Sequence, residues 1–328
     1  FLFLNKPDDN RPITIVTCGI NSFKVINYTF GYDAGNRVLK TISDVLLGFT
    51  KNSDDLNVYR IGGDEFAMVM LNTDHLEATN LSNRIKKSID SIRTFDFDLS
   101  ISCGFSTSKA DEPLSETLNR ALSDMSTNKV YDGSSITMKT IDLVMSTLFE
   151  KSKRESLHSD RVSTLSRKIA EGLGLDESFI SRTEMAGKLH DIGKINVSEE
   201  ILNKPDRLED HEWHKIKVHP ETGYKILASV PEYLGLANIV YSHHEKWDGS
   251  GYPRGLSRES IPFEARIIAV ADAFDAMTKD RTYRNALTRQ EALDEIRKHS
   301  GTQFEPDVVD VFLNNVMGEE SEGASNVA

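Results

Sequence analysis

Residues 59–70, with the sequence YRIGGDEFAMVM, predict a β-hairpin that carries two carboxylates at its tip. Apolar, strand-forming residues stand on both sides of a Gly-Gly-Asp-Glu segment, and glycines in such a position mark a tight turn. Asp64 and Glu65 are therefore expected at the end of the hairpin.

The sequence around the hairpin alternates strand-like and helix-like segments. ITIVTCGI (13–20) and LSISCGFS (99–106) are typical of strands, whereas AGNRVLKTISDVLLGF (34–49) and LEATNLSNRIKKSIDSI (76–92) are typical of helices. This pattern predicts an α+β domain with a central, mainly antiparallel sheet and flanking helices, which we place in residues 1–140.

The second half of the chain lacks strand signals. Val162, Leu165, Ile169 and Leu173 recur at helical spacing, so we predict an all-α helical bundle over residues 141–318. The segment TIDLVMSTLFEKSKRESLHSDRV (140–162) contains no Pro- or Gly-rich linker and is expected to form one long helix that joins the halves. The polar tail 319–328 is expected to be disordered.

The composition is that of a soluble globular protein. The 328 residues suggest about two domains, and no apolar run approaches the roughly 18 residues of a membrane span. The net charge of −12 argues against a general nucleic-acid or anionic-membrane surface, because such surfaces need a basic field. Cys18 and Cys103 lack metal-ligand spacing and are expected to be small buried residues of a cytoplasmic protein. The chain begins without Met, so we expect a fragment whose missing N-terminus holds a sensor or an anchor.

Histidines and aspartates of the second half form a set with the chemistry of a metal centre. The candidate ligands are His158, His190, Asp191, His219, His243, His244 and Asp272. Imidazole and carboxylate suit Fe, Mn, Zn or Ni, and the absence of Cys from the set argues against a closed structural zinc site. The set fits two ions bridged by Asp191 and a water, which together can activate water and clamp a phosphodiester. Lys194, one turn after His190, is placed to neutralise a phosphate oxygen.

Three segments of this half resemble the motifs of HD-GYP phosphodiesterases, a branch of the HD superfamily. They are HDIGK (190–194), HHEKWDGSGYP (243–253) and ADAFDAMTKDRTYR (271–284), and the similarity extends over about 145–317. The resemblance implies hydrolysis of cyclic di-GMP, and in some members of cyclic GMP-AMP, to the linear dinucleotide pGpG or to GMP. It also implies that the ligand set above holds two divalent ions, with Fe or Mn expected first and Zn, Ni or Mg as alternatives.

The resemblance also assigns residues to catalysis and to substrate binding. Lys194 and Asp191 take the catalytic roles, and the substrate contacts fall on Gly251, Tyr252, Asp275, Arg281 and Arg284. The two arginines stand at (i, i+3), so an extension of the helix that carries Asp272 can offer cations to the phosphates. The arginines can alternatively pair with surface acids, and the Gly-Tyr-Pro stretch can be only a turn. The Glu that binds a third ion in some members is replaced by Arg154, with Glu155 offset by one position.

Residues 60–66, RIGGDEF, resemble the motif of GGDEF diguanylate cyclases, which condense two GTP into cyclic di-GMP. NSFKVIN (21–27), GYDAGNRVL (31–39) and SISCGFS (100–106) extend the resemblance over about 12–140. The positions that correspond to the nucleotide and metal site are Asn27, Asn36, Asp64 and Glu65.

Several positions depart from the GGDEF pattern. The family's Asp-x-Asp at the end of the first strand is Gly19-Ile20-Asn21 here, so both carboxylates are missing. Asn36 replaces an acid that reads guanine, and an amide cannot offer two acceptors as a carboxylate does. The inhibitory Arg-x-x-Asp site is also missing from the corresponding residues 53–56, SDDL. We therefore expect no cyclase activity, and both GTP binding without turnover and a structural or dimerising role stay open.

These features predict a cytoplasmic bacterial signalling protein that hydrolyses cyclic di-GMP and carries a degenerate, regulatory GGDEF domain. Its expected partners are cyclic di-GMP as substrate, GTP at the GGDEF domain and a second copy of the chain in a homodimer, with no nucleic acid. Two alternatives stay open. One is hydrolysis of cyclic GMP-AMP or another nucleotide, and the other is a module that senses nucleotides without turning them over.

Overall fold

The computed structural model of the protein describes residues 12–51, 55–73, 75–109, 112–279 and 286–318. By its internal contacts the chain divides into two compact units, Phe1–Leu143 and Val144–Ala328. Within the described ranges, no helix is both long and apolar enough to cross a membrane. The tail 319–328, for which we predicted disorder, lies outside the described residues, as do residues 53 and 54 of the SDDL segment.

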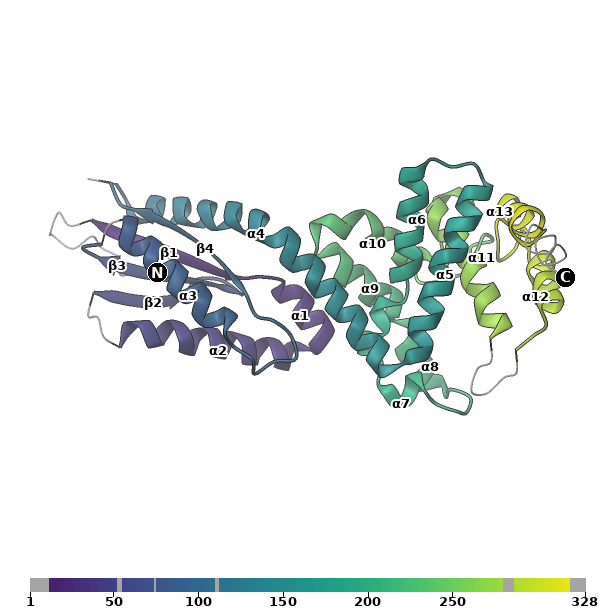
Figure 1. The fold of residues 1–328 in the computed structure, drawn as a ribbon, viewed down its shortest axis with the longest axis horizontal. Helices are drawn as coiled ribbons and strands as arrows, with labels where there is room; N and C mark the ends of the chain where they lie inside the picture. Colours follow the sequence, from purple (N-terminus) through teal and green to yellow (C-terminus); the bar gives the residue numbers. More distant parts are fainter. Residues whose placement is uncertain (1–11, 52–54, 74, 110–111, 280–285, 319–328) are drawn as a thin grey trace, which may run out of the picture. The chain divides into compact units, whose positions relative to one another are not determined.

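The first unit is a four-stranded antiparallel sheet with helices on both faces (Figure 1). Its elements are β1 (Ile13–Ile20), α1 (Phe23–Phe30), α2 (Tyr32–Thr50), β2 (Leu56–Arg60), β3 (Glu65–Leu71), α3 (His75–Asp90), β4 (Ile101–Thr107) and the start of α4 (Leu114–Lys151). The strands lie in the order β2-β3-β1-β4, and each neighbouring pair is antiparallel. The predicted α+β fold and its β2-β3 hairpin are therefore confirmed.

The central strand β1 is covered on both faces. Successive residues of a strand point to opposite sides of its sheet, so β1 contributes to two cores. On one side Ile20 belongs to a cluster with Val38 of α2 and Ile85 of α3. On the other side Ile15 belongs to a cluster with Leu118 of α4. This double burial explains why β1 is apolar along most of its length and why its C-terminal end is a well-ordered place for a site.

The second unit is all-helical, as its apolar spacing predicted (Figure 1). After the end of α4 it contains α5 (Lys153–Gly172), α6 (Glu177–Leu189), η1 (Ile192–Asn196), α7 (Glu199–Leu202), α8 (Asp210–Lys217), α9 (His219–Ala228), η2 (Pro231–Tyr233), α10 (Leu234–Ser242), η3 (Arg258–Ser260), α11 (Phe263–Thr278), α12 (Arg289–Lys298), α13 (Pro306–Val311) and η4 (Phe312–Val316). Helix α5 packs against α6 and α11, and α9 packs against α10 and η1.

The joining segment is not one continuous helix, so that prediction was wrong. Helix α4 crosses the boundary between the units but ends at Lys151, and α5 begins at Lys153. Ser152 between them has extended backbone angles, φ −152° and ψ 102°. The carbonyl of Lys151 accepts a hydrogen bond from the Asn203 side chain at 2.9 Å, and the Lys151 ammonium donates to the carbonyl of Ile195 at 2.7 Å. The Asn203 contact satisfies one carbonyl at the end of α4 without a further helical turn, and the Lys151 contact holds that end against η1.

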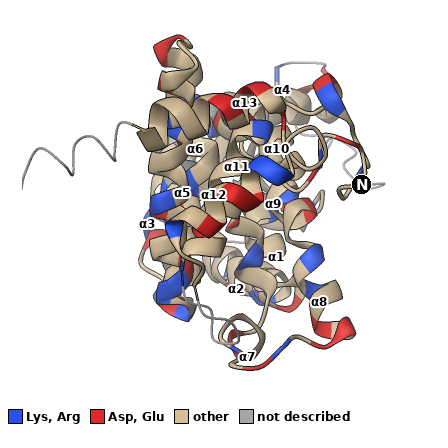
Figure 2. Cartoon of the chain, turned by 90° about the vertical axis from the view of Figure 1, so that its right-hand side faces the viewer, with Lys and Arg blue, Asp and Glu red and all other residues tan. Residues whose placement is uncertain are grey.

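Acidic and basic residues are interspersed over the helices (Figure 2). Arg167 of α5, for example, pairs with Glu171, Glu177 and Glu184 at 2.8 to 2.9 Å. Mixing of this kind leaves an anionic ligand to be held by the cations close to its own site.

Candidate metal centre

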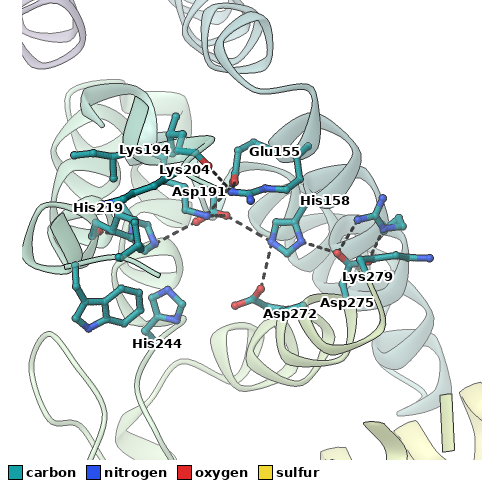
Figure 3. Close-up of a pocket in the computed structure, with 18 of the residues that line it drawn as sticks. Glu155, His158, Asp191, Lys194, Lys204, His219, His244, Asp272, Asp275 and Lys279 are labelled. Atoms are coloured by element: carbon teal, nitrogen blue, oxygen red, sulfur yellow. Dashed lines mark hydrogen bonds and ion pairs between the residues drawn. The ribbon is translucent and has the colours of Figure 1, made fainter. Parts of the chain in front are cut away.

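The structure brings the predicted metal ligands of the second unit together from several helix ends. His158 comes from α5, His190 and Asp191 follow α6, His219 begins α9, His243 and His244 follow α10, and Asp272 comes from α11. Three groups have ligand atoms within 4.8 Å of one another: His219 with His243 and His244, His158 with His190 and Asp272, and His190 with Asp191 and His243. Several of these side chains point toward one another in Figure 3.

Gly193 allows the segment HDIGK (190–194) to lie against α9. A Cβ added to Gly193 would lie only 1.9 Å from the carbonyl oxygen of His219 and 2.6 Å from the nitrogen of Gly223. Any larger residue would push η1 away from α9. The close approach keeps Asp191, at the start of η1, beside His219.

Backbone carbonyls fix the orientation of three imidazole rings. The Nδ1 atoms of His190, His219 and His243 lie 2.8, 2.7 and 2.6 Å from carbonyl oxygens three residues earlier. Because a carbonyl can only accept, each Nδ1 carries the proton and each Nε2 presents a lone pair. Nε2 of His190 is buried without a hydrogen-bond partner among the described residues, and those of His219 and His243 face each other at 3.1 Å. Lone pairs arranged in this way fit a cation between them.

Asp191 lies at the centre of the cluster. Its Oδ2 is 3.1 Å from Nε2 of His190. The same oxygen is 3.6 Å from Nε2 of His158, whereas Oδ1 is 3.2 Å from Nε2 of His219 (Figure 3). The two carboxylate oxygens therefore face different histidines. A carboxylate with this orientation has the geometry to bridge two cations.

His158 lies between two carboxylates. Its Nε2 is 3.2 Å from Oδ1 of Asp272, and its Nδ1 is 2.7 Å from Oδ2 of Asp275 (Figure 3). Asp275 is buried and also accepts hydrogen bonds from Arg161 at 2.5 and 2.9 Å. Asp275, which we expected to contact substrate, borders the pocket, and its carboxylate also holds the ring of His158 from behind. Neither this contact nor Arg161 was anticipated from the sequence.

Burial keeps part of the cluster neutral and leaves part of it charged. Burial lowers the pKa of His219 to about 3 and that of His244 to about 4, and it holds the pKa of His243 well below its usual value. Burial also acts to lower the pKa of His158, but hydrogen bonds to Asp272 and Asp275 outweigh it and raise that pKa to about 10. A divalent cation at Nε2 of His158 would compete with this proton for the same lone pair.

Lys194 is held between two buried carboxylates. Its ammonium donates to Oδ2 of Asp191 at 2.7 Å and to Oε2 of Glu155 at 2.9 Å. Burial acts to lower the pKa of Lys194, but the two negative charges outweigh it and raise that pKa above its usual range. Arg154 donates to the other oxygen of Glu155 at 3.1 Å. Glu155, which the sequence left without a role, thus fixes a permanent positive charge beside the cluster.

The Gly-Tyr-Pro loop is shaped by its own backbone contacts. A Cβ added to Gly251 would lie 2.6 Å from Cα of Glu245, so the loop folds back on itself at a position that only glycine can occupy. Glu245 is buried and accepts a hydrogen bond from the backbone nitrogen of Arg254 at 2.7 Å. The ring of Tyr252 lies against His244, with centroids 4.9 Å apart.

A pocket of about 160 Å³ opens at the cluster. Among the residues that line it are the predicted ligands His158, Asp191, His219, His244 and Asp272, together with Lys194, Tyr252 and Asp275. Arg161, Lys204, Trp213 and Lys279 also line it, and the sequence analysis gave none of them a role, although Lys279 lies within the segment 271–284. Arg281 and Arg284, which we expected to contact the nucleotide, lie outside the described residues.

The predicted nucleotide and metal site of the first unit lies at the C-terminal end of β1, next to the tip of the β2-β3 hairpin. Gly19 is paired with Glu65 across the β1-β3 ladder. The side chain of Asn21 donates to Ser100 Oγ at 3.1 Å and accepts from Ser102 Oγ at 2.9 Å. Asp64 pairs with Lys129 at 3.4 Å, and about a third of each of these side chains is exposed. In the described part of this unit, no group of three His, Cys, Asp or Glu ligand atoms comes together.

Asn27 and Asn36, the predicted nucleotide-binding positions on α1 and α2 of the first unit, have different surroundings. A Cβ added to Gly35 would lie only 1.9 Å from Oδ1 of Asn27, so the Asn27 side chain packs directly against this glycine. Asn36 is exposed and lines a cleft of about 500 Å³ with Lys40, Arg60 and other residues of α2 and the hairpin. Neither Asn27 nor Asp64 lines that cleft.

Comparison with known proteins matches both halves of the chain. The HD domain family matches residues 141–308, and the diguanylate cyclase GGDEF domain family matches residues 3–132. A cyclic di-GMP phosphodiesterase of Thermotoga maritima is 46% identical over 158 residues, which cover 48% of this chain and 43% of that protein. The 3'3'-cGAMP-specific phosphodiesterase 2 of Vibrio cholerae is 37% identical over 167 residues, which cover 50% of this chain and 32% of that protein.

The solved structure of the active GGEEF domain of a diguanylate cyclase from Vibrio cholerae aligns with 37% of this chain and 78% of its own length. The sequence identity is 25% and the TM-score is 0.35. The chain spans less than half the length of each of these two curated relatives.

Proposed function

The chain belongs to the HD domain family, and we propose that its second unit is a metal-dependent phosphodiesterase that hydrolyses cyclic di-GMP to pGpG, to GMP or to both. The observation that carries the proposal is the arrangement around Asp191, whose two oxygens face histidines of different ligand groups. A centre of this kind suits the attack of water on a phosphodiester. The name of the relative from Thermotoga maritima supports the choice of substrate.

The proposed cofactor is a pair of divalent cations. His219, His243 and His244 would hold one ion, and His158, His190 and Asp272 would hold the other, with Asp191 as the bridge. Nitrogen-rich ligand sets with some carboxylate suit Fe or Mn, and Zn, Ni or Mg are the alternatives. When bound, the two ions supply Lewis acidity at phosphorus and activate water for attack.

The surrounding side chains would orient the substrate and balance its charge. Lys194, protonated and held by Glu155, would donate to a nonbridging phosphate oxygen as negative charge develops there. Asp275 and Arg161 would keep the ring of His158 in place. Tyr252 would border the nucleotide beside His244. Gly251, Arg281 and Arg284 stay proposed substrate contacts on the family resemblance alone.

For the remainder of the chain we propose a degenerate GGDEF domain over residues 1–140 and an HD-GYP domain over 141–318. The loss of both β1 carboxylates supports a regulatory or GTP-binding role for the first domain without cyclase activity. We further propose a cytoplasmic location and a homodimer. Both follow from a signalling role and are testable by fractionation and by sedimentation.

Cyclic GMP-AMP is the second candidate substrate. The relative of Vibrio cholerae that is named for its cGAMP specificity is 37% identical to this chain over 167 residues. Side-by-side turnover of cyclic di-GMP and 3'3'-cGAMP decides between them, with the ratio of kcat/KM values as the measure.

The proposal is tested by incubating the full chain with cyclic di-GMP after it has been stripped of metal and reloaded with Fe, Mn, Zn or Ni. Chromatography should show pGpG or GMP with at least one ion, and none with the stripped protein. A double variant, His190→Ala with Asp191→Ala, serves as the control for contaminating nucleases. If no ion supports product formation, the proposed activity is wrong.

A further inference from the structure

A large aromatic side chain stands exposed at the rim of the pocket. Trp213 of α8 is 44% exposed, although an indole gains much by burial. It lines the same pocket as the metal cluster, together with the apolar side chains of Leu208 and Ile216. One wall of the pocket is thus apolar and aromatic, whereas its floor is formed by imidazoles and carboxylates.

The helix that carries Trp213 is fixed at its start. Glu209 and Glu212 form a capping box at the N-terminus of α8. Lys204, which also lines the pocket, donates to both oxygens of Glu212 at 2.7 and 2.8 Å. These contacts hold the first turn of α8, so the indole next to Glu212 is presented by an ordered element. A side chain on an ordered helix loses little conformational entropy when a ligand binds to it.

A cation links this indole to the Gly-Tyr-Pro loop. The ammonium of Lys217 lies 5.9 Å from the centre of the Trp213 ring and 5.1 Å from that of Tyr252. Tyr252 in turn lies against His244 of the cluster, 4.9 Å between centroids. An aromatic and cationic surface therefore runs from the proposed metal centre out to the rim.

We propose that Trp213 is a specificity-determining residue that stacks on a purine base of the dinucleotide whose phosphodiester lies at the metal cluster. This inference rests on the proposed function. The pocket volume of about 160 Å³ is below the roughly 300–1,000 Å³ that usually enclose a small ligand, so a dinucleotide must extend over the rim. An exposed aromatic face there accepts any base by its π-surface, and stacking of this kind is a common means of nucleotide binding. Lys217 between the two rings suits the negative charge of the linking backbone.

The chain offers a matched internal control for a binding experiment. It contains two tryptophans, Trp213 and Trp247, and only Trp213 lines the pocket. Trp247 lies beneath the guanidinium of Arg266, 5.7 Å from it, and its backbone bonds Gln303. A Trp247→Phe variant therefore leaves the pocket indole as the only tryptophan, and a Trp213→Phe variant leaves only the other.

Tryptophan fluorescence of the full, Mn²⁺-loaded chain measures stacking without turnover when a phosphorothioate analogue of cyclic di-GMP is the probe. We expect the analogue to quench the Trp247→Phe variant strongly and the Trp213→Phe variant little. Equal quenching of both, or none in either, would overturn the inference. If the analogue quenches Trp213 but the protein hydrolyses no nucleotide, the base contact is supported and the proposed activity is wrong. The experiment therefore tests the base contact independently of the proposed activity.

Steady-state kinetics give the second measurement. Trp213→Ala should raise KM for cyclic di-GMP roughly 5- to 150-fold with little change in kcat, because one stacked base is lost. Trp213→Tyr, which keeps an aromatic face, should restore most of the affinity. Hydrolysis of methyl p-nitrophenyl phosphate, which carries no nucleobase, should be unchanged in both variants, and so should bound metal.

Three outcomes would contradict a role in base stacking. Equal losses on both substrates would mean that Trp213 only supports the fold. An unchanged KM together with a change in sedimentation would assign Trp213 to a contact between protein chains. Failure of Trp213→Tyr to recover affinity in a folded, metal-loaded protein would exclude stacking as the cause.

Discussion

Each unit contains an aspartate–lysine pair at its candidate site, and these two pairs differ in their distance and in their exposure. In the second unit Asp191 and Lys194 are 2.7 Å apart, and their side chains are only 3% and 17% exposed. In the first unit Asp64 and Lys129 are 3.4 Å apart, and their side chains are 31% and 34% exposed. Asp191 and Lys194 belong to a buried network, in which the loss of one charge leaves the other uncompensated. Asp64 and Lys129 form a partly exposed ion pair, whose attraction is already screened by water.

The surroundings of the two pairs explain this difference. Burying several carboxylates together is unfavourable unless cations and hydrogen bonds compensate them. In the second unit Lys194, Arg154 and the imidazoles supply that compensation around Asp191 and Glu155. In the first unit the places of two carboxylates at the end of β1 hold a glycine and an amide. Asn21 bonds Ser100 and Ser102 and so needs no cation. The GGDEF hairpin therefore keeps its shape although the neighbouring strand end carries no carboxylate at Gly19 or Asn21.

Removal of the central ligands should have the largest effect. The double variant His190→Ala, Asp191→Ala should lose bound metal and more than about a thousandfold of the hydrolysis rate, because several kcal/mol of transition-state stabilisation come from the ions. Metal analysis of the purified protein and product chromatography measure both quantities. The matched change in the other unit, Asp64→Ala with Glu65→Ala, should leave both unchanged. Loss of hydrolysis in that control would show that the acidic tip takes part in the chemistry.

Substitution of the two lysines tests the comparison directly. Lys194→Met should lower kcat roughly 10²- to 10³-fold, as loss of one donor to a developing oxyanion does. It should also lower the free energy of unfolding by about 3–5 kcal/mol, since Asp191 and Glu155 stay buried without their cation. Lys129→Met should cost less than about 1 kcal/mol and leave kcat unchanged. Denaturant unfolding with a probe in each unit gives the stability values. Equal costs for the two lysines would contradict the distinction between the pairs.

Asp275 provides a smaller test of the second unit. Asp275→Asn keeps the shape of the side chain but weakens the hydrogen bond that orients His158, so metal affinity should fall about 10- to 100-fold. Competition with a chelator measures the affinity. As a control, Asp294→Asn on the exposed face of α12 should leave it unchanged. If Asp275→Asn instead raises KM at constant metal affinity, Asp275 contacts substrate as the family resemblance implied.

Local patterns in the sequence were sufficient for most of the fold. The hairpin at 59–70 follows from strand-forming residues around Gly62 and Gly63, and the helical bundle follows from apolar spacing. The break at Ser152 could not be predicted, because the side chain that satisfies the end of α4 comes from Asn203, 52 positions later. A contact with a residue far away in the sequence cannot be predicted from the residues that surround the helix end.

The same limit applies to the candidate site. Residue types and motif spacing were enough to select the candidate metal ligands that the structure brings together. They did not reveal that Asp275 would hold His158, a contact across 117 positions, or that Glu155 would hold Lys194 across 39. The exposure of Trp213 depends on how α8 lies against its neighbours, which helical periodicity does not specify.

Restoring the missing carboxylates of the first unit should have the smallest effect, and it tests most directly why the described residues of that unit form no cluster of candidate metal ligands. In a background with His190→Ala and Asp191→Ala, Gly19→Asp and Asn21→Asp add two acids beside Asp64. A Cβ at Gly19 would lie 3.1 Å from Met125 Sδ and 3.4 Å from Lys129 Nζ, flexible groups that can yield. Loss of the Asn21 donor should cost about 1 kcal/mol, and Mg²⁺ should return about as much by binding only the folded state. Mg²⁺-dependent unfolding of the first unit measures this gain. If the background protein without the added acids gains the same stability from Mg²⁺, Asp64 already holds an ion, and the contrast between the two units is wrong.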